Sequence, residues 1–203
     1  MEPEEIFRLS FFLLLFAFLG IRAYYGRKST WTKRTRKERK EDLELEGKGS
    51  AILLLVMWVF YMVWSFLYIV GFPGIEWSFF TLNVEWRIIG LIESILAVLY
   101  IWWAQKTLGS HFTATITILD GATLVTEGPY ARVRHPIYSA NTLFNSAVVL
   151  ITTTWIFLIL LLIGIPWTYE RMFKEEEKMI EQFGEKYEIY MGKTGRIFPR
   201  FRQ

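Results

Sequence analysis

Long apolar runs alternate with charged blocks along this chain, and this alternation is the first guide to its structure. Five runs stand out, at residues 6–25, 51–70, 86–104, 137–151 and 155–169. An α-helix needs about 20 apolar residues to cross the hydrocarbon core of a bilayer, and the first three runs come close to that length. The pattern predicts an all-α integral membrane protein with about five transmembrane helices, a polar linker before the fourth of them and a further C-terminal helix.

The last two runs are short and are separated only by Thr152 to Thr154, so they could form a hairpin of two spans or one broken helix. Charge in the loops favours the hairpin. The loop 26–50 carries nine Lys or Arg residues, which places it in the cytoplasm and the N-terminus outside. With five spans the polar segments 105–135 and 168–203 both face the cytoplasm, whereas a single last span would leave the basic tail outside.

The composition agrees with a membrane protein. The chain is 53% hydrophobic and 18% aromatic, with a mean hydropathy of +0.27, which is too apolar for an ordinary soluble domain. It has no cysteine, which excludes disulfides, cysteine-ligated zinc and a thiol nucleophile. The net charge of +3 is modest and the basic block lies beside a span, so membrane lipids are expected as partners rather than nucleic acid.

Polar chemistry gathers at the edge of the fourth run, in "GPYARVRHPIYSANTLF", residues 128–144. Pro136 suits the first turn of a helix, because its fixed φ fits that turn. Proline lacks a backbone N–H, and an N–H at that position would have no acceptor within the helix. His135 then lies beside the helix cap. Arg132 and Arg134 could help this helix end bind an anion. They could equally reach to lipid headgroups as membrane anchors, and spacing alone favours the anchors.

A second polar group follows the fifth run, on a helix expected to continue into "ERMFKEEEKMIEQF". Arg171 and Glu175 are four residues apart and therefore share a face, with Glu176 beside them. Taken alone, the pair is more typical of a surface salt bridge. Its position within a turn or two of a span's end favours a functional role, because ionisable groups at that depth are costly.

Two other chemistries have little support. "MGKTGR" lacks the glycine that a phosphate loop requires five residues before its Gly-Lys pair, since that position is Tyr187. His111 has no histidine or carboxylate at ligand spacing, so no metal site is expected.

Three segments follow one another in the second half of the chain: "LGSHF", "DGATLVTEGPYARVRHPIY" and "RMFKEEEKMIEQFGEKYEIYMGKTGRIFP". In content, order and spacing they resemble the isoprenylcysteine carboxyl methyltransferase (ICMT) family, and the tail is especially similar to its small five-span archaeal branch. The resemblance covers about residues 105–199, roughly half of the chain. The first two spans match the family only in number and hydrophobicity.

The resemblance implies one membrane methyltransferase domain over 1–203 that binds S-adenosylmethionine at the cytoplasmic face, through 105–138 and 168–199. Arg171 matches the arginine that faces the methyl acceptor, and Glu175 matches the cofactor-binding glutamate, so these two form the implied catalytic pair. The residues implied to line the cofactor are Ala122, Thr123, Leu124, Val125, Tyr130, His135, Pro136, Ile137, Tyr138, Glu175 and Glu176.

The implied reaction is methylation of the C-terminal carboxylate of a prenylated cysteine or a similar lipophilic carboxylate. A carboxylate is already ionised at neutral pH, so it needs a cation such as Arg171 to orient it rather than a base. Its lipophilic part should enter sideways from the bilayer, through an opening among the third, fourth and fifth spans. Three alternatives stay open: a phospholipid N-methyltransferase, an NADPH-dependent sterol-reductase-like enzyme and a non-catalytic membrane scaffold.

Overall fold

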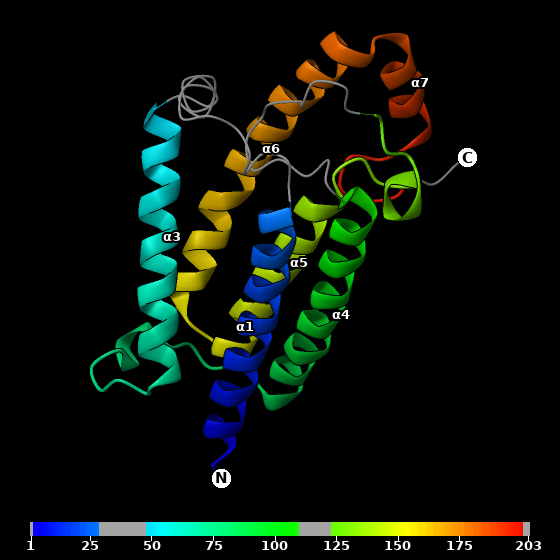
Figure 1. Cartoon of the computed structure of the whole chain (residues 1–203). Helices are drawn as coiled ribbons and strands as arrows, with labels where there is room; N and C mark the ends of the chain where they lie inside the picture. Colours follow the sequence, from blue (N-terminus) through cyan, green and yellow to red (C-terminus); the bar gives the residue numbers. More distant parts are fainter. Residues whose placement is uncertain (1, 29–47, 110–122, 201–203) are drawn as a thin grey trace.

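The fold is a bundle of long helices, seen in a computed structural model that describes residues 2–28, 48–109 and 123–200 (Figure 1). The described residues contain two isolated β-bridges and no strand, which confirms the all-α prediction. The helices are α1 (Pro3–Lys28), α3 (Lys48–Ile69), α4 (Val84–Leu108), α5 (Pro136–Thr152), α6 (Trp155–Phe183) and α7 (Glu185–Lys193), with short 3-10 helices η2 (Glu76–Ser78) and η4 (Gly128–Ala131).

Four of these helices, α1, α3, α4 and α6, are long and apolar enough to cross a membrane. The run at 137–151, expected as the fourth span, forms α5, which has 17 residues. At 1.5 Å per residue it is about 25 Å long, somewhat less than a hydrocarbon core of about 30 Å. Its short length is tolerated because α5 packs against α1, α4 and α6.

Helices α4 and α5 lie unusually close together. At Gly90 an added Cβ would stand 2.7 Å from the Cβ of Leu150 and 3.1 Å from the carbonyl oxygen of Ala147, so only a glycine fits there. Ala97 and Ala140 are fully buried along the same pair. Small residues allow helices to approach closely within a bilayer, where apolar burial alone gives little driving force. This packing fixes the start of α5 against the bundle.

The chain reverses between α5 and α6, as the hairpin interpretation requires (Figure 1). Thr153 takes a left-handed conformation with φ 51° and ends α5. Its carbonyl accepts a 2.8 Å hydrogen bond from the N–H of Phe80, and Thr154 forms an isolated bridge with Phe79. Helix α6 then runs back past the start of α5 for 29 residues, about 43 Å, so its second half extends beyond the apolar segment 155–169.

A polar network ties the bundle together at the N-terminal end of the chain. Arg87 donates to Glu4 over 2.7 Å and to the carbonyl of Ile151 over 2.9 Å. The hydroxyl of Tyr68 donates to the other Glu4 oxygen over 3.0 Å. These contacts join α1, α3, α4 and α5, while the polar segments 123–135 and 170–200 gather at the opposite end (Figure 1).

Candidate active site

The C-terminal tail folds back onto the linker that precedes α5. Val133 and Gly195 form a parallel bridge, and the N–H groups of Arg134 and His135 donate to the carbonyls of Gly195 and Arg196 over 2.8 and 3.0 Å. A Cβ at Gly195 would stand 1.7 Å from the Phe198 carbonyl oxygen, so this approach requires glycine. The two polar segments expected on one face are therefore joined directly.

Glu176 on α6 is the centre of a buried ionic cluster. Arg134 Nε lies 2.8 Å from its Oε1, and Arg196 Nη2 lies 2.6 Å from its Oε2. His135 Nε2 lies 3.2 Å from Oε1. Burial by itself would raise the pKa of Glu176, but hydrogen bonds from His135, Arg196 and Arg134 outweigh it and hold the pKa well below its usual range. The carboxylate is ionised at neutral pH, and both of its oxygens already have partners.

Arg134 also stabilises the end of α7. Its Nη1 donates to the carbonyls of Met191 and Thr194 over 3.2 and 2.5 Å, groups that a helix end leaves without intrahelical partners. The membrane-anchor interpretation is therefore wrong for Arg134, because its guanidinium binds Glu176 and the end of α7 inside the protein. Arg132, by contrast, is exposed.

Glu175, the next residue on α6, faces a different group of partners. Its Oε1 accepts hydrogen bonds from the Tyr138 hydroxyl and, over 3.3 Å, from Arg171 Nε. Arg171 Nε also donates to the Tyr138 hydroxyl over 2.8 Å, so arginine, tyrosine and carboxylate form a closed triangle. The Glu175 side chain keeps 24% of its surface exposed, whereas Glu176 keeps 4%. Of the two carboxylates, Glu175 is the one that a ligand can reach.

His135 lies between the two carboxylates. Its Nε2 faces Glu176 and its Nδ1 stands 3.6 Å from Oε2 of Glu175, while the residue itself is only 8% exposed. Pro136 takes the first position of α5, as its sequence context indicates, and is buried. This start of α5 brings His135 and Tyr138 against the same stretch of α6.

The other expected cofactor residues are placed less centrally. Tyr130 is buried in η4, where its carbonyl accepts a 2.7 Å hydrogen bond from Tyr190 and its own hydroxyl has no partner in the described structure. Ile137 is half-buried against the apolar core. Thr123, Leu124 and Val125 lie in coil before η4, and Ala122 lies outside the described residues, as does His111.

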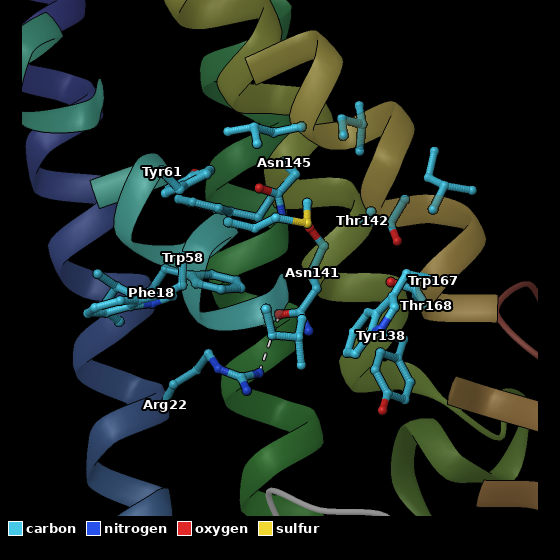
Figure 2. Close-up of a pocket in the computed structure, with 18 of the residues that line it drawn as sticks. Phe18, Arg22, Trp58, Tyr61, Tyr138, Asn141, Thr142, Asn145, Trp167 and Thr168 are labelled. Atoms are coloured by element: carbon cyan, nitrogen blue, oxygen red, sulfur yellow. Dashed lines mark hydrogen bonds between the residues drawn. The ribbon is translucent and has the colours of Figure 1, made fainter. Parts of the chain in front are cut away.

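A pocket of about 370 Å³ opens beside this triangle, between α1, α3, α5 and α6 (Figure 2). Most of its lining is apolar or aromatic, including Leu15, Phe18, Met57, Trp58, Leu160 and Leu161. Its polar lining includes Arg22, Tyr138, Asn141, Thr142, Asn145 and Thr168. No residue of α4 lines it, so the pocket lies among the first, second, fourth and fifth apolar runs rather than among the third, fourth and fifth.

Fold and site together define a membrane-embedded helical protein with an amphiphilic pocket that leads to a charged cluster. Residues 88–181 match the model of the isoprenylcysteine carboxyl methyltransferase (ICMT) family. This match confirms the resemblance seen in the sequence over residues 88–181, a little under half of the chain.

A solved structure of a eukaryotic intramembrane Ras methyltransferase ICMT is also similar, with a TM-score of 0.53 and 24% sequence identity. The match covers 75% of this chain and 53% of the solved one, so the chain spans about half the length of that relative. At this identity the likeness concerns the fold. No curated protein matches the chain.

Two arginines of the site escaped the sequence analysis. Arg196 has no local signal, because its partner Glu176 is twenty residues away and meets it only after the tail folds back. Arg22 did carry a signal, since it is one of two charges inside the run 6–25, with Arg8, and such residues are costly in a bilayer.

Proposed function

We propose that this protein is an S-adenosylmethionine-dependent membrane methyltransferase that methylates the C-terminal carboxylate of a prenylated cysteine or a similar lipophilic carboxylate. One observation carries the proposal: Tyr138 both lines the membrane pocket and bonds to Arg171 and Glu175. An apolar chain in the pocket would hold its polar end against this triangle. The match of residues 88–181 to the ICMT family supports the same chemistry.

The residue types fit a carboxylate acceptor. An ionised carboxylate needs desolvation and alignment rather than a base. The guanidinium of Arg171 stays charged, can grip a carboxylate with two parallel hydrogen bonds and cannot give it a proton. Arg171 is braced by Tyr138 and Glu175, so its position is set before an acceptor arrives. Its proposed role is to hold the acceptor oxygen, and the role of the pocket is to exclude water around it.

The residues also fit the proposed cofactor, which has an ammonium, a carboxylate and a sulfonium group. Glu175, partly exposed, suits the ammonium, and the N–H groups that begin α5 suit the carboxylate. The buried Tyr130 hydroxyl lacks a partner within the described residues, as expected of a group that bonds to a ligand. When bound there, the cofactor would supply the methyl group of its sulfonium to the acceptor oxygen, and the electron pair of the broken sulfur–carbon bond would stay on sulfur. No proton needs to move.

Glu176 is proposed to act differently from Glu175. With Arg134, Arg196 and His135 as partners, it holds the linker and the tail against α6 and so positions His135. It supports the cofactor site from behind instead of contacting the cofactor itself.

Calorimetric titration tests the cofactor part of the proposal. The protein in detergent should bind S-adenosylhomocysteine, the demethylated product, and should not bind NADPH. Binding of NADPH alone would favour a sterol-reductase-like enzyme, and binding of neither would favour a scaffold. A phospholipid N-methyltransferase would bind the same product, but its labelled product would be an amine that resists mild base, whereas a methyl ester releases methanol.

The site is further proposed to face the cytoplasm, with the N-terminus outside, because the basic loop 26–50 follows the positive-inside rule. The chain has no cysteine, so single introduced cysteines report orientation cleanly. A membrane-impermeant thiol reagent applied to intact cells should label exposed Pro73→Cys and leave Glu177→Cys unlabelled. The reverse pattern would invert the proposed orientation.

A further inference from the structure

Arg22 is a charged residue placed in the wall of the membrane pocket. It belongs to the apolar run 6–25 of α1, and it is half-buried. Figure 2 shows its guanidinium reaching from α1 toward Asn141 on α5. A guanidinium at this position is costly unless it has a polar partner or a function, and such residues often mark substrate paths.

The only hydrogen bond of Arg22 within the described structure goes to a neutral group. Nη1 donates to the side-chain oxygen of Asn141 over 3.3 Å. No described carboxylate lies within ion-pair distance of Arg22, whereas the other arginines around the site, Arg134, Arg171 and Arg196, each have one. The amide satisfies one donor and leaves the positive charge without a counter-ion from the described residues.

The charges at this end of the pocket add up to an anion site. Arg22 and Tyr138 line the same pocket, and the Tyr138 hydroxyl accepts a 2.8 Å hydrogen bond from Arg171. Glu175 offsets one of the two positive charges. The remaining single positive charge, at the polar end of an otherwise apolar pocket, suits a ligand with an apolar chain and one negative charge.

We propose that Arg22 is a specificity-determining residue that contacts the anionic end of the acceptor and selects acids over neutral or esterified amphiphiles. This inference rests on the proposed function, because it takes the acceptor to be the occupant of the pocket. It adds to Arg171 a second arginine, which comes from a helix outside the family-matched region 88–181. It also favours release of the product, since the methyl ester lacks the charge that Arg22 holds.

Binding measured without catalysis tests the role of Arg22. N-acetyl-S-farnesylcysteine and its methyl ester are titrated separately into the protein in nanodiscs of zwitterionic lipid, for the wild type, Arg22→Gln and Arg22→Lys. The wild type should bind the acid more tightly than the ester by roughly 10-fold or more, as expected for a charge-assisted hydrogen bond. Arg22→Gln should lower this ratio severalfold by weakening acid binding alone, while Arg171 preserves the rest of the preference, and Arg22→Lys should keep most of the ratio. Each ratio is measured on one folded sample, so a general loss of stability does not imitate the effect.

Arg27→Gln is the matched control, because Arg27 is an exposed residue on the same helix and does not line the pocket. It should leave the acid-to-ester ratio unchanged. Equal weakening of acid and ester binding by Arg22→Gln, or no change in either, would overturn the role of Arg22 while leaving methyl transfer by the wild type intact. Wild-type protein that transfers no methyl group to the acid would instead refute the proposed function.

The anion that Arg22 binds could also be the phosphate of a lipid headgroup, and a further arm of the experiment distinguishes this phosphate from the acceptor carboxylate. Phosphatidylglycerol is added to the nanodiscs at increasing fractions. Acid binding by the wild type should change little. Strong competition that Arg22→Gln abolishes would assign Arg22 to a lipid phosphate and overturn its role in acceptor selection.

Discussion

Arg171 donates a 2.8 Å hydrogen bond from Nε to the hydroxyl of Tyr138, and this bond joins the middle of α6 to the first turn of α5. Because Tyr138 also lines the membrane pocket, the bond marks the point where the apolar and ionic parts of the site meet. The guanidinium additionally lies over the ring of Trp167, 5.4 Å from its centroid. Arg171 is thus held by two residues that line the pocket, Tyr138 and Trp167.

Replacing Arg171 by lysine should impair the acceptor side of the reaction. Lysine keeps the charge but loses the planar fork that holds a carboxylate by two bonds, so kcat/KM for the acceptor should fall roughly 10- to 100-fold. The affinity for S-adenosylhomocysteine should change less than about threefold. Steady-state kinetics and calorimetry measure the two effects, and Lys174→Gln on the exposed side of α6 serves as the control. Loss of cofactor affinity with normal acceptor kinetics would reverse the roles assigned to Arg171 and Glu175.

Glu175→Gln should weaken cofactor binding. The change keeps the size of the side chain but removes the charge proposed to pair with the cofactor ammonium, so the Kd for S-adenosylhomocysteine should rise roughly 10- to 100-fold. Glu177→Gln, two residues further on and exposed, should leave the Kd unchanged. An unaltered Kd in Glu175→Gln would place the cofactor elsewhere.

Filling the pocket should exclude long acceptors while sparing the cofactor site. Gly164 lines the pocket, and a Cβ added there meets no atom within 4 Å, so Gly164→Phe can extend into the open space without disturbing the bundle. The KM for a farnesylated acceptor should rise at least about tenfold, because a buried apolar chain loses its space. The Kd for S-adenosylhomocysteine should stay the same.

Gly20→Phe provides the matched control for this experiment. Gly20 also has open space around its Cβ position, but it lies on α1 away from the pocket lining. An equal rise in KM for Gly20→Phe and Gly164→Phe would show that the acceptor does not use this pocket.

Glu176→Gln should destabilise the protein. Removing the negative charge leaves Arg134 and Arg196 buried or half-buried without their counter-ion, which typically costs about 3–5 kcal/mol. For a chain of this size the thermal midpoint should fall by roughly 10 °C or more. Glu181→Gln disrupts an exposed pair with Lys178 and should cost less than about 1 kcal/mol. Equal midpoints for the two variants would show that the cluster is unimportant for stability.

The same cluster predicts a dependence on pH. The folded pKa of Glu176 is below its value of 4.5 in an unperturbed carboxyl, so its contribution is complete above about pH 4.5 and is lost as the pH falls toward the folded pKa. The difference in thermal midpoint between the wild type and Glu176→Gln should therefore be largest near pH 7 and should shrink below pH 4.5. A difference that grows on acidification would contradict this assignment.

Much of the helical architecture was predictable because it depends on local pattern. Apolar runs of bilayer length indicated the spans, the four-residue spacing placed Arg171 beside Glu175, and Pro136 indicated the start of α5. The short length of α5 was visible in the run 137–151. The bundle accommodates so short a helix through its close contact with α4 at Gly90, and this contact cannot be read from any single apolar run.

The ionic partners were not predictable, since they depend on how distant segments meet. Nothing near Arg134 indicated that it would pair with Glu176, because the two come together only when the tail folds back through Gly195. The membrane pocket was likewise not predicted, and the opening expected among the third, fourth and fifth spans stays a prediction. The family-like segments lie in the second half of the chain, whereas α1 and α3 supply one side of the pocket, including Arg22.

Transfer of a radiolabelled methyl group from S-adenosylmethionine tests the central claim most directly. Purified protein is incubated with N-acetyl-S-farnesylcysteine in one reaction and with a membrane lipid extract in another, and the products are treated with mild base. The account predicts label on farnesylcysteine that base releases as methanol and that Arg171→Lys strongly reduces. Label found only in base-stable lipid, with none on the farnesylated acid, would contradict it.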